Sequence, residues 1–227
     1  MEYRRWEPIY RAICRDFGFD PATDRRARDR LHAMTPGFDG DRLPTVAGRS
    51  VAITAPGEGL AAALADLDPG TVVVAAGGSL DRVLEQRGAV DLLVTDLDGH
   101  RRDVADLSRQ GIPLVIHAHG DNIAQLEKTV PRCNLENVLP TTQVAPRNHV
   151  RNPGGFTDGD RAAFLVDELG AGSLQFPGWD LSDDAVGPIK RRKLEWAARL
   201  LAWLEDARGE QFDCLDGLRD GLAPLPP

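Results

Sequence analysis

The sequence has no long apolar run and only three cysteines. No stretch of about 18 apolar residues occurs among its 227 residues, so no membrane-spanning helix is expected. The first 18 residues contain neither the apolar block nor the small-residue cleavage site of a secretory signal. Cys14, Cys133 and Cys214 lie far apart and form no CxxC pair. These absences argue against a disulfide framework or a thiolate zinc site and predict a cytoplasmic protein.

Lysine is also scarce, because arginine supplies all but three of the 27 basic residues. Lys190 and Lys193 lie three positions apart in IKRRKLEW, on one face of an expected helix. Such a charged run usually forms a solvated surface; the alternative is that Lys193 contacts a phosphate. The net charge is −8, and residues 50–189 carry 20 acidic but only 10 basic groups. That excess excludes a general nucleic-acid surface, although Mg²⁺ can still bridge carboxylates to a polyphosphate.

Short apolar runs alternate with amphipathic segments from residue 50 onward, and several runs are apolar on both faces. This pattern predicts an α/β domain in which a parallel sheet lies between two helical layers, with a Rossmann-like arrangement. The expected strands are residues 50–55, 71–76, 91–96, 113–119, 139–144 and 173–176.

The expected organisation is an N-terminal helical segment (1–47), the α/β domain (48–208) and a C-terminal tail (209–227). The N-terminal segment should form two amphipathic helices with a break near residues 18–21. Four apolar side chains of the last long helix either cover the core or form a homodimer contact; they are Trp196, Leu200, Leu201 and Trp203.

Polar and glycine-rich segments follow the expected strands. In parallel sheets, ligands bind beyond the carboxyl ends of the strands, so these segments should line a common site. They are PGEG (56–59), GG (77–78), TDLDGH (95–100), HAHGDN (117–122) and GGFTDGD (154–160).

Asp96 and Asp98 stand two positions apart at the end of an apolar strand. If the strand continues through them, both side chains lie on the same face, where their mutual repulsion favours a bound cation. Oxygen ligands suit Mg²⁺. The alternative is that VTDLDG is only a turn, since Asp and Gly are common turn residues.

HAHGDN offers a further acid and two histidines. Asp121 is interpreted as a third magnesium ligand or a residue that positions a substrate, the alternative being a helix cap. His117 and His119 are either buried core residues or, with less support, zinc ligands, because no further His or Cys stands at ligand spacing.

Two glycine-containing turns can approach an anion. GGFTDGD places backbone amides at a helix N-terminus, where Thr157 and Asp160 also fit a capping box. Asp158 is a carboxylate that can hydrogen-bond to a polar ring. PGEGL opens a helix but has neither the lysine of a GxxxxGK[ST] loop nor the spacing of GxGxxG, so its phosphate-loop signal is weak.

Together, VTDLDG, HAHGDN and GFTDGDRA resemble the archaeal 6-hydroxymethyl-7,8-dihydropterin pyrophosphokinase family, which is similar in fold and motif order to thiamine pyrophosphokinases. The resemblance extends over residues 48–205, including the KRRKLEWA helix. It implies Mg²⁺-dependent transfer of diphosphate from ATP to the hydroxymethyl group of a reduced pterin, with release of AMP, in a folate or methanopterin type of pathway.

The resemblance also implies roles for particular residues. Asp96 and Asp98 would hold Mg²⁺ against the triphosphate, with Asp121 completing the shell or orienting the hydroxyl group. His119 is a candidate for proton transfer. The residues expected near ATP or the pterin are Pro56, Gly57, Gly59, Asn122, Thr157, Asp158 and Lys193.

The chain departs from the family pattern at two turns. Ala55-Pro56-Gly57-Glu58-Gly59 replaces a Gly-Pro-Ser-like turn, and Gly77 stands where the family often has an acidic residue. The missing acid leaves open a nucleotide-binding module without turnover.

A haloacid dehalogenase-type phosphatase is another alternative, with Asp96 as nucleophile, Asp98 as general acid and Lys128 as the only formal candidate for the lysine. The residues do not distinguish a pterin from a thiamine-like alcohol.

Overall fold

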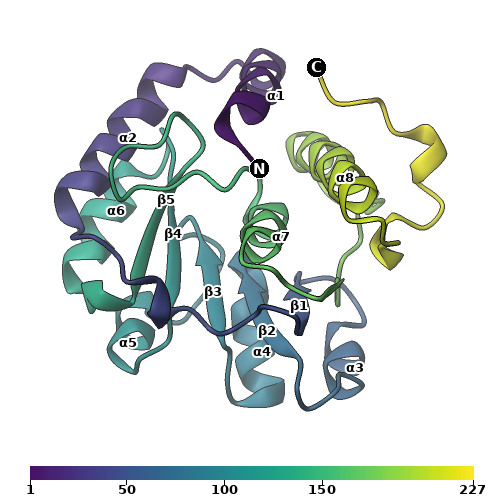
Figure 1. Cartoon of the computed structure of the whole chain (residues 1–227), viewed down its shortest axis with the longest axis horizontal. Coiled ribbons are helices and arrows are strands. Elements are labelled where there is room, and N and C mark those ends of the chain that lie inside the picture. The colour runs from purple at the N-terminus through teal and green to yellow at the C-terminus, as the bar shows by residue number, and fades with distance from the viewer.

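The computed structural model describes all residues from 1 to 227 and contains one six-stranded, all-parallel sheet in the order β5-β4-β3-β2-β1-β6 (Figure 1). Each strand lies within or one residue away from an expected run, so the prediction of a parallel α/β fold is confirmed. The strands are β1 (Ser50–Thr54), β2 (Val72–Ala76), β3 (Leu92–Thr95), β4 (Leu114–Ala118), β5 (Val138–Thr142) and β6 (Ser173–Gln175).

The strand order explains why the helices form two layers. From β1 to β5 the chain always steps in the same direction across the sheet, and from β5 to β6 it returns past β1. Right-handed crossovers therefore place the helices of the first four connections on one face and α7 on the other. The first set is α3 (Leu60–Ala65), α4 (Leu80–Arg87), α5 (Val104–Arg109) and α6 (Ile123–Thr129), and the return helix is α7 (Asp158–Glu168).

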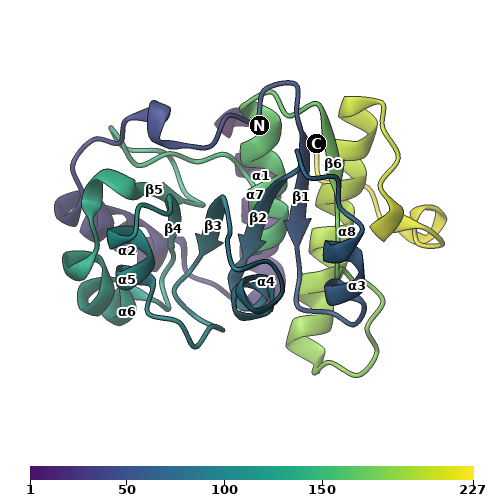
Figure 2. The same cartoon turned by 90° about the horizontal axis from the view of Figure 1, so that it is seen from below.

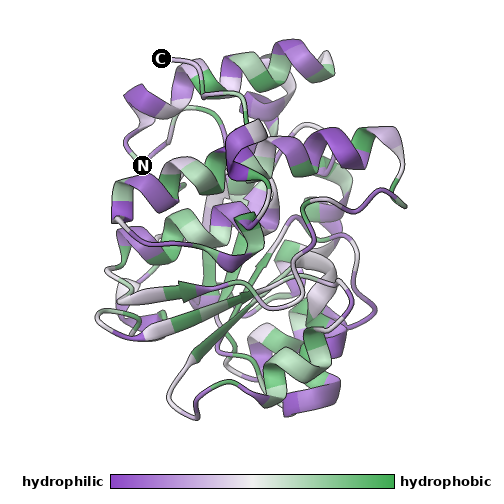
Figure 3. Ribbon diagram, turned by 90° about the vertical axis from the view of Figure 1, so that its right-hand side faces the viewer, coloured by the Kyte–Doolittle hydropathy of each residue, from purple (hydrophilic) through white to green (hydrophobic).

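Both faces of the sheet are buried because successive side chains of a strand point in opposite directions. In β2, Val72 and Val74 belong to the core on the α7 face, whereas Val73 and Ala75 belong to the core on the α4 face. Figure 3 shows the apolar strands between helices whose polar faces point outward. A fully buried Val contributes roughly 1.5–3 kcal/mol to folding, so these strands are a main source of stability.

The N-terminal segment forms two helices, as predicted, and they pack on the α/β domain. α1 (Tyr3–Phe17) ends at Gly18, which adopts φ 72°, and α2 (Pro21–Met34) begins after Asp20, whose side chain accepts a hydrogen bond from Ala22 N–H. Such a left-handed conformation favours glycine. Figures 1 and 2 show α2 beside β5 at one edge of the sheet and α8 (Pro188–Arg208) at the β1–β6 side.

The last long helix and the tail share the core of the α7 face with α1. Trp196, Leu200 and Leu201 of α8 are buried there, so these side chains cover the core. Phe212 and Leu215 of the tail are buried in the same cluster. The three cysteines are free thiols. None of the helices is long and apolar enough to cross a membrane.

Candidate active site

Two adjoining pockets lie at the carboxyl edge of the sheet. They are surrounded by the loops after β1–β5, the β6–α8 segment and the start of α7. The first, here called the acidic pocket, has a volume of about 350 Å³, and the second, the glycine pocket, about 740 Å³. Thr157, Asp158 and Lys193 line both. The acidic pocket consists of residues 18–20, 23, 24, 96, 117, 119–121, 143, 156–158, 161 and 193. The glycine pocket consists of residues 55–57, 76–78, 99, 157–159, 178–180, 183, 189, 190, 193 and 194.

Asp96 follows directly after β3 and lines the acidic pocket. Its Oδ1 accepts a hydrogen bond from Asp98 N–H at 3.1 Å, and its Oδ2 lies 3.4 Å from Nε2 of His119. Burial would raise the pKa of Asp96, but the hydrogen bond and the charge of His119 outweigh burial and hold the pKa below its ordinary value. Asp96 is therefore ionised at neutral pH and available to a cation.

The expectation that Asp98 shares a face with Asp96 is wrong. β3 ends at Thr95, and Leu97 adopts φ 75°, a conformation that interrupts the alternation of a strand. Asp98 is exposed, accepts a hydrogen bond from Gly99 N–H and lines neither pocket. The turn interpretation of VTDLDG thus describes Asp98, whereas Asp96 is at the site.

The residues of HAHGDN have three different roles in the structure. His119 and the exposed Asp121 both line the acidic pocket, and Asp121 N–H donates to Nδ1 of His119 at 3.3 Å. Since Nδ1 accepts, Nε2 carries the proton toward Asp96. Asn122 is buried and donates to the carbonyl oxygens of Asp96 and His117 at 2.9 and 2.7 Å. Asn122 therefore holds the ends of β3 and β4 together and does not line either pocket.

Asp158 begins α7 and lies between the two pockets. The predicted capping box is present, since Asp160 accepts hydrogen bonds from the backbone N–H and the hydroxyl group of Thr157. Gly155 adopts φ 84°, and a Cβ there would lie 2.3 Å from Cα of Arg161. This close approach, which only glycine permits, sets the position from which Asp158 starts the helix.

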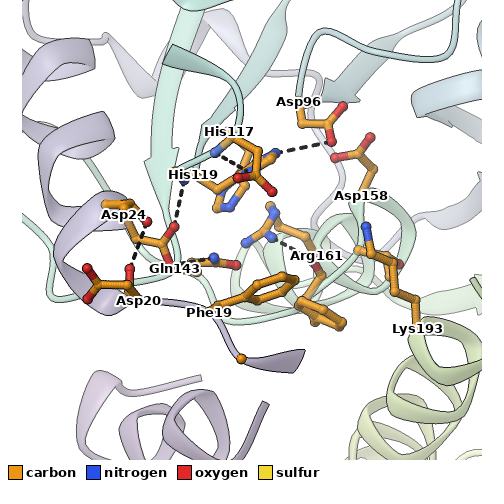
Figure 4. Close-up of a pocket in the computed structure, with 16 residues that line it drawn as sticks. Phe19, Asp20, Asp24, Asp96, His117, His119, Gln143, Asp158, Arg161 and Lys193 are labelled. Carbon is orange, nitrogen blue, oxygen red and sulfur yellow. Dashed lines mark hydrogen bonds and ion pairs between the residues drawn. The ribbon is translucent and has the colours of Figure 1, made fainter. Parts of the chain in front are cut away.

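The carboxylates of Asp96 and Asp158 face each other in Figure 4, with Lys193 of α8 beside Asp158. Burial, followed by the negative charge of Asp96, raises the pKa of Asp158 well above its ordinary value. Two facing carboxylates repel unless a cation lies near them. The structure therefore pairs Asp96 with Asp158, where the sequence suggested Asp98.

The glycine pocket is built largely from main chain. The β1–α3 and β6–α8 loops touch directly: Gly57 N–H donates to Gly178 O at 2.9 Å, and a Cβ on Gly57 would lie 2.3 Å from that oxygen. Pro56 and Gly57 line the pocket, but Gly59 is exposed outside it, at the start of α3. A Cβ on Gly77 would lie 2.7 Å from Oδ2 of Asp158, so the carboxylate of Asp158 fills the space beside this glycine.

No three His, Cys, Asp or Glu side chains converge in an arrangement that could hold a metal ion. Asp96, Asp98 and Asp121 thus form no ready cluster, and His117 and His119, whose rings stack at 6.0 Å, have no third zinc ligand. Mg²⁺ usually takes only one or two carboxylates and completes its shell with water and substrate phosphates. The facing oxygens of Asp96 and Asp158 fit that requirement.

Several residues that line the two pockets are not marked by any motif in the sequence. Phe19, Asp20 and Asp24 come from the N-terminal helices, far from the motifs in sequence, and only the packing of α2 against β4 and β5 brings them to the site. Gln143 follows β5, and Trp179 follows β6. Arg161 lies within GFTDGDRA, and its burial beneath the acidic pocket appears only in the structure.

Comparisons with known proteins agree with the motifs. No family model matches the chain. A 6-hydroxymethyl-7,8-dihydropterin pyrophosphokinase of Methanothermobacter thermautotrophicus is 37% identical, over 93% of this chain and 100% of its own. Proteins of the same name from Pyrococcus furiosus and Methanocaldococcus jannaschii are 36% and 32% identical, each over 91% of this chain and over 95% and 97% of their own.

The chain belongs to the 6-hydroxymethyl-7,8-dihydropterin pyrophosphokinase family. The resemblance drawn from three motifs is therefore confirmed, and the chain is a member of a family of diphosphotransferase enzymes.

The geometry also argues against the phosphatase alternative. Asp98, the general acid in that hypothesis, is exposed and lines neither pocket. Lys128 is exposed on α6 and lines neither pocket. A pyrophosphokinase family member has no need of either residue in those roles.

Proposed function

We propose that this protein transfers diphosphate from ATP to the hydroxymethyl group of 6-hydroxymethyl-7,8-dihydropterin and releases AMP, in a folate or methanopterin type of pathway. The observation that supports this most is the pair of facing carboxylates, Asp96 and Asp158, at the junction of two pockets. When diphosphate passes from one bound substrate to another, the two substrates must meet at a place where its charge is neutralised. The family membership indicates which substrates these are.

The reaction makes one bond and breaks another. The hydroxyl oxygen of the pterin bonds to the β-phosphorus of ATP, while the bond from that phosphorus to the oxygen bridging the α-phosphate breaks. AMP leaves with the bridging oxygen, and the hydroxyl proton passes to water, because both ring nitrogens of His119 are already engaged with Asp96 and Asp121. Such transfers depend on positioning and on neutralisation of charge more than on covalent catalysis.

Asp96 and Asp158 would hold Mg²⁺, and Asp121, which lines the same pocket, would add negative charge near the ion, whereas Asp98 lines neither pocket. When bound, Mg²⁺ would neutralise charge on the transferred phosphoryl groups. Lys193 lies on both pockets and adds a positive charge beside the same phosphates. Pro56, Gly57 and Thr157 shape the wall of the pocket proposed for ATP, and Asn122 acts by holding β3 against β4.

The direct test is incubation with ATP, Mg²⁺ and 6-hydroxymethyl-7,8-dihydropterin. We expect AMP and the pterin diphosphate to form in equal amounts, and thiamine to be a much poorer acceptor. Formation of ADP in place of AMP, or a complete absence of turnover, would contradict the proposal.

Substitutions of the two neighbouring aspartates give a matched pair. Asp96→Asn removes the charge that faces Asp158, so kcat/KM should fall by about 10²–10³-fold, the usual cost of losing one preorganised electrostatic group. Asp98→Asn changes an exposed carboxylate that lines neither pocket, and its kcat/KM should fall less than about 10-fold. Equal losses in the two variants would mean that the assignment of Asp96 as the principal ligand is wrong.

A further inference from the structure

The two pockets differ in charge and size, and this difference distinguishes their ligands. The acidic pocket has five carboxylates, from Asp20, Asp24, Asp96, Asp121 and Asp158, against the two cations of Arg161 and Lys193. A triphosphate placed entirely within it would face strong repulsion. The glycine pocket is about twice as large and has three carboxylates, from Asp158, Asp180 and Asp183, against two lysines, so its acidic excess is smaller.

The acidic pocket contains hydrogen-bond acceptors that suit a neutral heterocycle rich in N–H groups. Gln143 donates its Nε2 to Asp24 at 2.7 Å, and this bond leaves its amide oxygen pointing into the pocket (Figure 4). Asp20 uses Oδ1 to cap α2, and its second carboxylate oxygen carries no hydrogen bond within the chain. A reduced pterin presents an amino group and ring N–H groups that such oxygens can accept.

The same pocket has an aromatic wall that is held in place by neighbouring rings. Phe19 lines the pocket from the α1–α2 turn and stacks on Phe17 at 5.2 Å, and Phe17 lies 5.3 Å from Phe156 on the other side. Arg192 of α8 lies over the Phe17 ring at 4.7 Å. A flat heterocycle can pack against such a fixed aromatic surface.

The floor of the pocket contains two buried polar atoms without partners in the chain. Nε of Arg161 and Nε2 of His117 account for two of the four such side-chain atoms in the protein. Arg161 and His117 are 1% and 2% exposed, and both line the acidic pocket. Unpartnered buried groups are costly and rare in native proteins, so their concentration here indicates a pocket that is completed by a polar ligand.

The α1–α2 turn is fixed over the carboxyl ends of the strands by a buried carboxylate. Asp24 accepts hydrogen bonds from Gly120 N–H at 2.7 Å, from the Tyr10 hydroxyl at 2.6 Å and from Gln143. These bonds join α1, α2, the loop after β4 and the loop after β5. The turn is thus attached to the same strand ends that carry the reacting groups.

We infer that the acidic pocket is the acceptor subsite and that the α1–α2 turn, residues 18–24, is the element that recognises the heterocycle. Phe19 stacks on the ring, and Asp20 with the Gln143 amide oxygen accepts its N–H groups. The nucleotide enters through the glycine pocket, and the two substrates meet at Asp96 and Asp158. This inference rests on the proposed function and adds to it an assignment of each substrate to one pocket.

Steady-state kinetics of the full-length enzyme with both substrates varied tests the assignment. Phe19→Ala should raise KM for the pterin about 10-fold or more and leave KM for ATP within two-fold. Asp20→Asn keeps the helix cap and should raise KM for the pterin several-fold. Lys190→Ala should show the opposite pattern, with a higher KM for ATP alone. Arg26→Ala, on the exposed face of α2, is the matched control and should change neither.

Equilibrium titration of the pterin without ATP provides a second readout that does not need turnover. Phe19→Ala and Asp20→Asn should weaken pterin binding by similar factors, with circular dichroism showing that both variants are folded. The inference is overturned if wild-type enzyme turns over but these two variants alter the KM for ATP, or alter neither constant. If the wild-type enzyme binds the pterin but makes no AMP, the proposed function fails while the pocket assignment stands.

Discussion

At the scale of single residues, the site depends on Asp158 being held against Asp96. Burial and the charge of Asp96 raise the pKa of Asp158 well above its ordinary value, so the free protein disfavours ionisation of a carboxyl group that is ordinarily ionised at neutral pH. Active sites often store such repulsion until a ligand relieves it. The strain should therefore be measurable as a dependence of stability on pH and on Mg²⁺.

Replacing Asp158 should stabilise the free protein at neutral pH. Between its ordinary pKa and its raised folded-state pKa, the folded protein retains a proton that the unfolded chain has released, so stability falls as pH rises through this window. Asp158→Asn removes this loss, worth about 1.4 kcal/mol per pKa unit. Each pKa unit of the shift therefore corresponds to an increase in Tm of about 3–6 °C for a chain of this length.

Thermal unfolding at pH 4 and pH 7.5, with and without Mg²⁺, checks this expectation. The gain should shrink at pH 4, and Mg²⁺ should raise Tm for the wild-type protein but not for the variant. Asp66→Asn changes an exposed carboxylate without an ion-pair partner and should leave Tm unchanged. A variant that is less stable than wild type at pH 7.5 would show that Asp158 makes a favourable interaction in the free protein.

Several residues that a motif marked in the sequence lie at the candidate site, although their roles stay predictions. Asp96, Thr157, Asp158 and Lys193 all line a pocket. The prediction failed for Asp98 because period-two geometry assumes an extended backbone, and the left-handed Leu97 ends that geometry one residue too early. No pattern in the sequence announces such a conformation at a leucine, since glycine and asparagine are its usual residues.

At the scale of elements, the glycine pocket depends on two loops that touch without side chains between them. Ala55 N–H donates to Pro177 O and Gly57 N–H to Gly178 O. Because these loops leave neighbouring strands toward opposite faces of the sheet, they meet where ligands commonly bind in such folds. Their close approach therefore shapes the site as well as the fold.

Gly178→Ala should disrupt this contact. Gly178 adopts φ 76°, and a Cβ there would lie 2.3 Å from Ala55 O. Alanine at this position would therefore have a strained backbone, and its Cβ would also collide with the carbonyl oxygen of Ala55. We expect a loss of about 3 kcal/mol in the free energy of unfolding and a raised KM for ATP. Gly37→Ala, at a glycine with open space around it, should change stability by less than about 0.5 kcal/mol. Denaturant unfolding of both variants makes the comparison, and equal losses would contradict the proposed close-packing role.

Elements were the most predictable level of this structure, for a physical reason. Runs such as TVVVAA are apolar on both faces, and only a covered parallel sheet buries both. The contacts between elements were not predictable, because they join distant segments. The Trp6 indole N–H donates to Gln143 O across 137 positions, and neither residue belongs to a motif.

At the scale of the whole molecule, α1, α8 and the tail share one core with the α7 face of the sheet, and α2 belongs to the core on the other face. Trp6 and Ile9 of α1 lie in the same buried cluster as Leu201, Phe212 and Leu215. Segments that share a core are expected to unfold together. The three segments named from the sequence are therefore expected to behave as one cooperative unit.

Leu215→Ala tests that cooperativity from the tail. Leu215 is 0% exposed, so its truncation should cost about 2–5 kcal/mol while tryptophan fluorescence and far-UV circular dichroism still report one coincident transition. Leu225→Ala, at a half-buried position near the chain end, should cost less than about 1 kcal/mol. A separate early transition in the Leu215→Ala variant would show that the tail unfolds independently.

The position of the α1–α2 turn has a consequence for how the enzyme is made. The helices that carry it are synthesised first, yet Gly120 and Gln143, which donate hydrogen bonds to Asp24, are translated 96 and 119 positions later. At roughly 5–20 residues per second, these helices wait on the order of ten seconds at the ribosome exit without their packing surface. The nascent chain thus exposes the apolar face of α1 until α7 and α8, which share its buried cluster, are synthesised, and this interval is the stage at which a chaperone would act.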